Sequence, residues 1–277
     1  MRKISLILFF FSLPVLAFKI YFDYDNWEAR FIKEPLDTFS IPDLNYRIKN
    51  YLRGLTYDSD KTLEEYLLLN PRVERRFNHL FLNYQEEKKN FLSDGSQIIE
   101  YSLSLKPDLF GLIAKKTGER FLIGELACPL CKRPWPKDMP IPEGVKLIPY
   151  EEIGIVKEKY TGIIIDCRHL SLKPAIFPKI YNEDLKEIYS LNFCDSLSLI
   201  ENGVVSYVKS LDSAYRHKKA GNFPLYLSGL KAVGKNKCDI VISNKDALIL
   251  HGSLNNLKLL EKARVIIVYK DAATSEK

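Results

Sequence analysis

A proline-rich segment, residues 125–156, divides this chain and constrains its fold more than any other feature. Residues 128–149 contain six prolines. Proline removes a backbone donor and breaks helix interiors and central strands, so an extended connector is expected here. The segments before and after it each mix helical and strand patterns. The sequence therefore predicts an α+β protein with two small mixed domains, residues 18–124 and 157–271, followed by a polar tail at 272–277.

The first seventeen residues have the pattern of a secretory signal peptide. Arg2 and Lys3 precede an apolar run at residues 4–13, and compact residues ending at Ala17 suit a cleavage site. The run is too short to span a bilayer comfortably, although an uncleaved anchor is the alternative. Phe18, not a cysteine, directly follows Ala17, so no lipid anchor is expected. This pattern predicts export to the periplasm.

Composition limits the partners. Hydrophobic residues make up 46% of the chain and charged residues 27%, which suits an ordinary globular protein. The formal charge of +6 falls to +4 when Arg2 and Lys3 are removed with the signal peptide. Such a small excess does not predict nucleic-acid binding. We expect no cofactor, and membrane association only through partner proteins.

Local patterns place the elements of the first domain. Residues 43–51 suit a short helix, and Ser59 or Asp60 suits the N-cap of a helical stretch that Pro71 interrupts. Asp94-Gly95 predicts a hairpin between a strand at 97–105 and a partner within 78–91. A helical turn at 110–113 and a strand at 121–126 complete the domain.

The second domain begins with a strand at 160–166, and its elements alternate between short strands and helices. Ser243-Asn-Lys-Asp246 resembles a capping box. The expected order is a hairpin at 179–189, an element at 203–211, a turn to Gly221, strands at 224–232 and 238–243, helices through Leu250 and at 254–261, and a strand at 264–269.

Cys128-Pro-Leu-Cys131 is the only close pair among the five cysteines. We expect a disulfide here that pins the connector, since exported proteins carry disulfides. A redox dithiol and half of a zinc knuckle are the alternatives. The redox motif lacks its following helix because Pro134 and Pro136 come too soon, and the knuckle lacks a second ligand pair. No metal site is therefore predicted.

Asp166, Cys167, Arg168 and His169 place an acid, a thiol, a cation and a base side by side. Cys167 and His169 share one face of a strand, so a catalytic dyad is geometrically feasible. No glycine-rich oxyanion turn accompanies it, and we expect no catalytic residue. Asp166 and Arg168 are expected to fix the end of a buried strand. Together with Lys173 they are also the candidate binding site for an anion.

Gly229-Leu-Lys-Ala-Val-Gly234-Lys235-Asn236 nearly matches a phosphate-binding loop. Asn236 replaces the hydroxyl residue that binds magnesium, and strands flank the stretch on both sides. A hairpin turn is expected instead.

The second domain resembles the exported bacterial LPP-twenty lipoprotein-like family, to which flagellar assembly protein T is related. The resemblance is carried by Asp166, Arg168, Lys173, Pro174, Ala175 and Pro178, and by the segments Gly203-Val-Val-Ser-Tyr207, Gly221-Asn-Phe-Pro224-Leu and Asp239-Ile-Val-Ile-Ser243. In the first domain it is weaker and rests on Pro71-Arg-Val-Glu-Arg75 and Asp94-Gly95. It implies an envelope protein with an assembly, structural or motility-linked role.

Departures from that family fall on the reactive residues. Cys167, His169 and Ser171 stand where the family has Ala, Gly and Gly, and the Cys128–Trp135 insert has no counterpart. We therefore expect a non-enzymatic periplasmic protein, associated with the outer membrane through envelope or flagellar proteins. The alternatives are a thiol-disulfide oxidoreductase that uses Cys128 and Cys131, and a small anionic-ligand-binding module.

Overall fold

The structure is a computed structural model that describes residues 20–35, 40–80, 82–106, 108–116, 118, 120–150 and 159–270. The predicted signal peptide at 1–17 and the polar tail at 272–277 lie outside these ranges. Helices and several sheets make up a mixed α+β fold, as predicted. Within the described ranges, no helix is both long enough and apolar enough to cross a bilayer.

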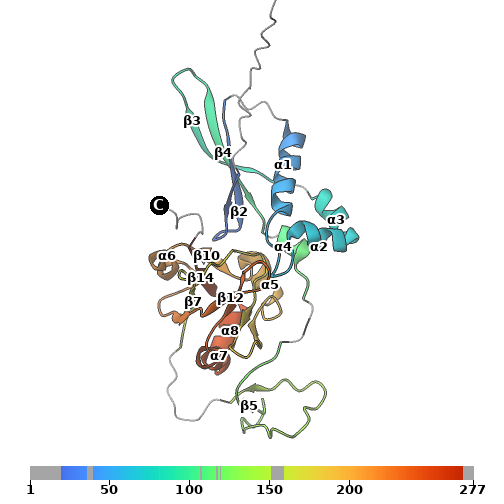
Figure 1. Ribbon diagram of the computed structural model, residues 1–277, viewed down its shortest axis with the longest axis vertical. Coiled ribbons are helices and arrows are strands. Elements are labelled where there is room, and N and C mark those ends of the chain that lie inside the picture. Colours follow the sequence, from blue (N-terminus) through green and yellow to red (C-terminus); the bar gives the residue numbers. More distant parts are fainter. Residues whose placement is uncertain are drawn as a thin grey trace, which may run out of the picture.

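An antiparallel sheet dominates the N-terminal half (Figure 1). Its strands are β1 (Ile20–Asp23), β2 (Glu28–Lys33), β3 (Gln85–Phe91) and β4 (Gln97–Ser104). They lie in the order β1-β2-β4-β3, so β3 is an edge strand. The hairpin predicted at Asp94-Gly95 is confirmed, and Gly95 has a φ of 81°. β1 and β2 were not predicted, because only Ala29 and Phe31 of β2 are buried.

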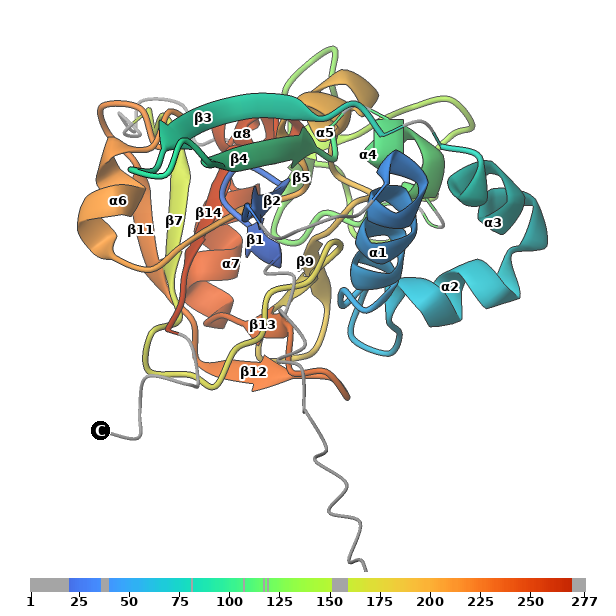
Figure 2. The ribbon, with the colours of Figure 1, turned by 90° about the horizontal axis from the view of Figure 1, so that it is seen from above.

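Four helices accompany this sheet, and Figure 2 shows α1 to α3 lying to one side of it. They are α1 (Ile41–Arg53), α2 (Leu63–Leu69), α3 (Pro71–Asn78) and α4 (Asp108–Ile113). The predicted cap at Ser59 or Asp60 is wrong. Thr62 caps α2, because its hydroxyl accepts from the Glu65 N–H while the Glu65 carboxylate accepts from the Thr62 N–H at 2.7 Å.

The C-terminal half contains a four-stranded parallel sheet. Its strands, in spatial order, are β10 (Ser206–Val208), β14 (Val265–Val268), β7 (Ile163–Asp166) and β11 (Leu225–Ser228). Every residue of the two central strands is buried. Their unbroken apolar runs are typical of strands covered on both faces.

A second, mixed sheet packs beside the first. It contains β12 (Lys231–Val233), β13 (Asp239–Val241), β8 (Ile180–Tyr181) and β9 (Glu187–Tyr189) in that order. The predicted hairpin at 179–189 is confirmed. The single strand predicted at 224–232 is wrong, since β11 ends at Ser228 and the chain enters β12 of the other sheet at Lys231. The turn at Gly234, with a φ of 86°, then joins β12 to β13 as a hairpin, as expected.

Four helices complete this half: α5 (Ser196–Asn202), α6 (Leu211–Arg216), α7 (Asn244–His251) and α8 (Leu254–Glu261). The predicted cap of α7 is confirmed, because the Ser243 hydroxyl accepts from the Asp246 N–H at 3.0 Å. α5 and α6 were not predicted, since each is a short helix of six or seven residues.

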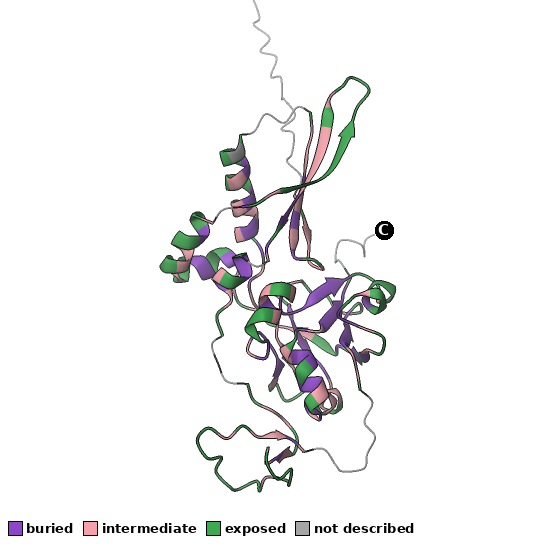
Figure 3. Ribbon diagram, turned by 180° about the vertical axis from the view of Figure 1, so that it is seen from behind, coloured by how far each residue is buried: buried purple, intermediate pink, exposed green. Residues whose placement is uncertain are grey.

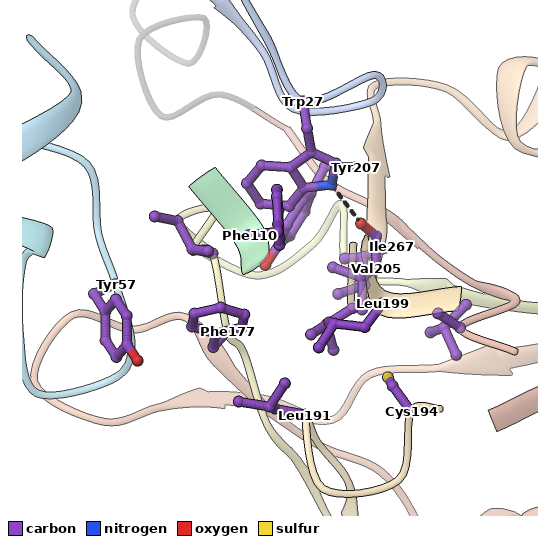
Figure 4. Packing of buried hydrophobic residues seen from close by; sticks show 14 of the residues in the cluster. Trp27, Tyr57, Phe110, Phe177, Leu191, Cys194, Leu199, Val205, Tyr207 and Ile267 are labelled. Atoms are coloured by element: carbon purple, nitrogen blue, oxygen red, sulfur yellow. Dashed lines mark hydrogen bonds between the residues drawn. The ribbon is translucent and has the colours of Figure 1, made fainter. Parts of the chain in front are cut away.

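One continuous core joins the two halves (Figure 4). Trp27, in the turn between β1 and β2, is fully buried, and its indole N–H donates to the Val205 carbonyl at 2.9 Å. Its ring meets those of Phe110 and Tyr207 at centroid distances of 5.2 and 6.2 Å. A side chain at Gly203 would lie 2.8 Å from the indole nitrogen. Trp27 of the N-terminal half is thus buried against residues of the C-terminal half. The predicted domain boundaries at 124 and 157 stay predictions.

The connector lies apart from both halves, at the lower end of Figure 1. β5 (Leu126–Ala127) pairs with β6 (Ile148–Pro149), and the chain between them is largely irregular and exposed (Figure 3). The strand predicted at 121–126 is wrong, since only Leu126 of that range lies in a strand. Phe121 is 72% exposed and has no strand partner among the described residues.

Candidate functional site

Asp166 ends β7 at the carboxyl edge of the parallel sheet, a position where α/β proteins often carry polar groups. Its carboxylate accepts from the Arg168 N–H at 3.1 Å, from Arg168 Nε at 2.9 Å and from Arg168 Nη2 at 2.7 Å. The Tyr226 hydroxyl donates a further bond at 3.0 Å. The Arg168 hydrogen bonds lower the pKa of Asp166 to about 2. The carboxylate is therefore ionised and occupied by local donors.

Cys167 and His169 do not form a dyad among the described contacts. The Cys167 side chain is fully buried, and burial raises the pKa of its thiol to about 12. His169 is exposed. A methyl group at Gly229 would lie 2.6 Å from the Cys167 sulfur, so this thiol fills a tight space between β7 and β11. Cys167 acts as a small buried apolar group.

Lys173, the third member of the predicted anion-binding set, lies apart from the other two. Its side chain is exposed, and within the described part of the chain no ion pair or hydrogen bond joins it to Asp166 or Arg168. Its backbone N–H donates to the Lys237 carbonyl instead. The structure thus brings Asp166 and Arg168 together and adds Tyr226, which no sequence signal indicated because it is 60 residues away.

Cys128 and Cys131 occupy the tip of a small hairpin in the connector. The Cys128 N–H donates to the Arg133 carbonyl at 3.0 Å, and the Trp135 N–H to the Leu126 carbonyl at 2.7 Å. Both sulfurs are free thiols in the structure. The N–H groups of Cys131 and Leu130 donate to the Cys128 sulfur and lower the pKa of that thiol. The disulfide between these residues stays a prediction.

A cleft of about 440 Å³ lies where the two halves meet. The loop at 57–61 and α2 form one wall, and the β8–β9 hairpin forms the other. Its volume falls within the range of small-molecule sites. Two of its lysines are already paired, Lys61 with Asp58 at 3.3 Å and Lys179 with Glu187 at 2.9 Å. The cleft therefore does not present a concentrated positive charge to an anion.

Asp239 is buried behind this cleft, with 2% of its surface exposed. Its carboxylate accepts from the Lys179 N–H at 2.8 Å and from the Ser59 side chain, which belongs to the other half. Burial raises the pKa of Asp239 to about 6. No local sequence pattern indicates the cleft, because segments 57–70 and 177–192 become neighbours only in the folded chain.

The structure contains a parallel-sheet domain, and Trp27 from the turn between β1 and β2 of the N-terminal sheet is buried against it. Residues 162–271, from β7 through β14, match the family model of the second domain of Treponema pallidum Tp0624. Comparison with curated proteins gave no match. The matched residues agree with the second domain predicted at 157–271, whereas the LPP-twenty and flagellar relation stays a prediction.

Proposed function

We propose that this is a non-enzymatic protein of the bacterial periplasm that acts through protein-protein contacts. It serves envelope assembly, envelope structure or the flagellum, as its resemblance to the LPP-twenty family implies. The two residues with the most reactive side chains near the end of β7, Asp166 and Cys167, are held in contacts that suit a structural role. Asp166 is held by Arg168 and Tyr226, and Cys167 is buried.

The β3–β4 hairpin is the observation that carries this proposal. All seven residues of β3 are exposed, and one edge of the strand faces β4 while the other is the edge of the sheet. Figure 1 shows the hairpin reaching beyond the body of the molecule. Near its tip, Phe91 and Leu92 are 68% and 41% exposed. An edge strand of this kind can pair with an extended segment of another protein.

The charges of β3 favour a protein partner over self-association. Glu86, Glu87, Lys88 and Lys89 place both signs on the strand, and a bulge lies between Glu86 and Lys88. Charged side chains and bulges protect edge strands from indiscriminate pairing. A partner segment that alternates the opposite signs would meet these charges across the strand pair.

Site-specific crosslinking tests the contact. A photoreactive residue replaces Asn90 on β3 in the cells that make the protein, and a matched one replaces Lys258, which is exposed on α8. We expect Asn90 to give one discrete adduct with an envelope protein, mapped by mass spectrometry to a single extended segment. Equal labelling from Lys258, or no adduct from Asn90, would contradict the proposal.

Export is tested separately by N-terminal sequencing of the protein from fractionated cells. The expected mature chain begins at Phe18 and is recovered in the periplasmic fraction. A chain that begins at Met1 and is recovered with the cytoplasm would overturn the periplasmic assignment, whatever the crosslinks show.

A further inference from the structure

The turn at Cys128-Pro-Leu-Cys131 has the backbone of a metal-binding knuckle. It closes a hairpin in which Ala127 bridges Pro134, and the Lys132 N–H donates to the Cys128 carbonyl at 3.0 Å. Lys132 has a φ of 61°, so the chain reverses in the left-handed conformation directly after the second cysteine. The turn thus holds two cysteines at the C-x-x-C spacing of thiolate pairs in structural zinc sites.

The surroundings of the turn suit thiolates. The N–H groups of Cys131 and Leu130 donate to the Cys128 sulfur, and the positively charged Lys132 directly follows the pair. Backbone N–H donors to sulfur stabilise the charged form that a metal ion requires. Residues 132–150, which follow the pair, contain no helix, so the arrangement lacks the helix N-terminus that activates redox dithiols.

A single chain supplies only half of a zinc site. Structural zinc binds four ligands in a tetrahedron, with zinc-sulfur distances of about 2.3 Å. All cysteines and histidines of the chain lie within the described residues, and no group of three metal-binding side chains occurs among those residues. The other three cysteines are buried elsewhere. Cysteine or histidine ligands that complete such a site would therefore come from outside the chain.

We propose that two copies of this chain join through their connectors, with Cys128 and Cys131 of both copies binding one Zn²⁺. The four thiols release their protons to solvent on binding, and no electron is transferred. Four thiolates around a dication leave a net charge of −2, which Lys132 and Arg133 of each copy offset. The inference concerns the connector alone and does not depend on the proposed periplasmic role.

The position of the turn lets two copies meet without a clash of their bodies. Figures 1 and 3 show the connector as an exposed projection away from the sheets. Leu130, between the two cysteines, is 90% exposed, and Met139 and Ile141 are 52% and 53% exposed. Contact with a second copy would cover this apolar surface, whereas a disulfide within the turn would leave Leu130 in water.

The test measures metal content and mass together. The protein is purified under reducing conditions and dialysed with Zn²⁺ or with a chelator, and its zinc is measured by atomic emission and its mass by light scattering. We expect about half a zinc ion per chain, as a shared four-thiolate site requires, a mass that doubles with Zn²⁺ and returns to the monomer with chelator. Co²⁺ in place of Zn²⁺ should give the intense visible bands of tetrahedral thiolate coordination.

Two variants make the outcome specific. Cys131→Ser, at an exposed position, should abolish both zinc binding and the change in mass, while Lys137→Ser in the same exposed segment should retain both. Thermal unfolding of each variant checks that the body is intact. One zinc per monomer, a zinc-independent dimer, a Cys131→Ser variant that still dimerises with Zn²⁺, or a Cys128–Cys131 disulfide without zinc in protein taken directly from cells would each overturn the proposal.

Discussion

Asp239 makes the stability of this protein depend on pH in an unusual direction. Its pKa rises from an ordinary 3.8 to about 6, because burial disfavours the charged carboxylate more than the Lys179 and Ser59 donors favour it. Below pH 3.8 the carboxyl is protonated in both the folded and the unfolded chain. Between the two pKa values the unfolded chain loses the proton and the folded chain keeps it. The contribution of the protonated Asp239 to the unfolding free energy is therefore complete below pH 3.8 and is lost as pH rises towards 6.

The magnitude follows from the size of the shift. A difference of about 2 pKa units, at about 1.4 kcal/mol each, corresponds to about 3 kcal/mol. Asp239→Asn keeps an oxygen that can accept from the Lys179 N–H but has no charge to bury. Relative to the parent, the variant should gain up to about 3 kcal/mol of unfolding free energy between pH 4 and pH 7.

Urea unfolding at four pH values between 4 and 7 measures this difference, with the fluorescence of buried Trp27 as the signal. Asp60→Asn is the matched control, because the same chemical change falls on an exposed side chain that lines the cleft between the two halves. Its pH profile should follow that of the parent. A difference between Asp239→Asn and the parent that stays constant over the whole pH range would refute the reasoning.

Two further predictions concern packing. Gly229→Ala should lower the unfolding free energy by about 1–3 kcal/mol, since its new methyl group would lie 2.6 Å from the Cys167 sulfur. Adding Cys167→Ala should recover most of that loss in thermal melts, and a double variant no more stable than Gly229→Ala would contradict this contact. Trp27→Ala should cost about 3–5 kcal/mol and destabilise both halves together. Calorimetry should show one shifted transition, and an unchanged separate transition for residues 162–271 would disprove the shared core.

Elements bounded by strong local signals were predictable from the sequence. The turn at Asp94-Gly95 and the cap at Ser243 each specify backbone conformation within four residues, and both were confirmed. The strand at 224–232 was misplaced because its two halves have similar composition. The chain crosses from one sheet to the other between them, where Gly229 packs closely against Cys167.

Among the candidate site residues, only those close together in the sequence could be paired from the sequence. Asp166 and Arg168 lie two residues apart, and their pairing could be inferred from the strand end that they follow. Lys173 lies close in sequence, but the chain turns away before it. The cleft and Asp239 could not be inferred, because Ser59 and Lys179 come together only when both halves fold.

The burial of Trp27 against the C-terminal half also affects how the chain folds as it is synthesised. Trp27 is among the first residues of the described chain to be made, but its hydrogen-bond acceptor, Val205, follows 178 residues later. Until then the indole N–H has no native acceptor, and the part of the ring that packs on Tyr207 stays uncovered. Contacts of such long sequence separation form slowly and leave aggregation-prone intermediates. We expect the nascent chain to require a holding chaperone until its last strands are complete.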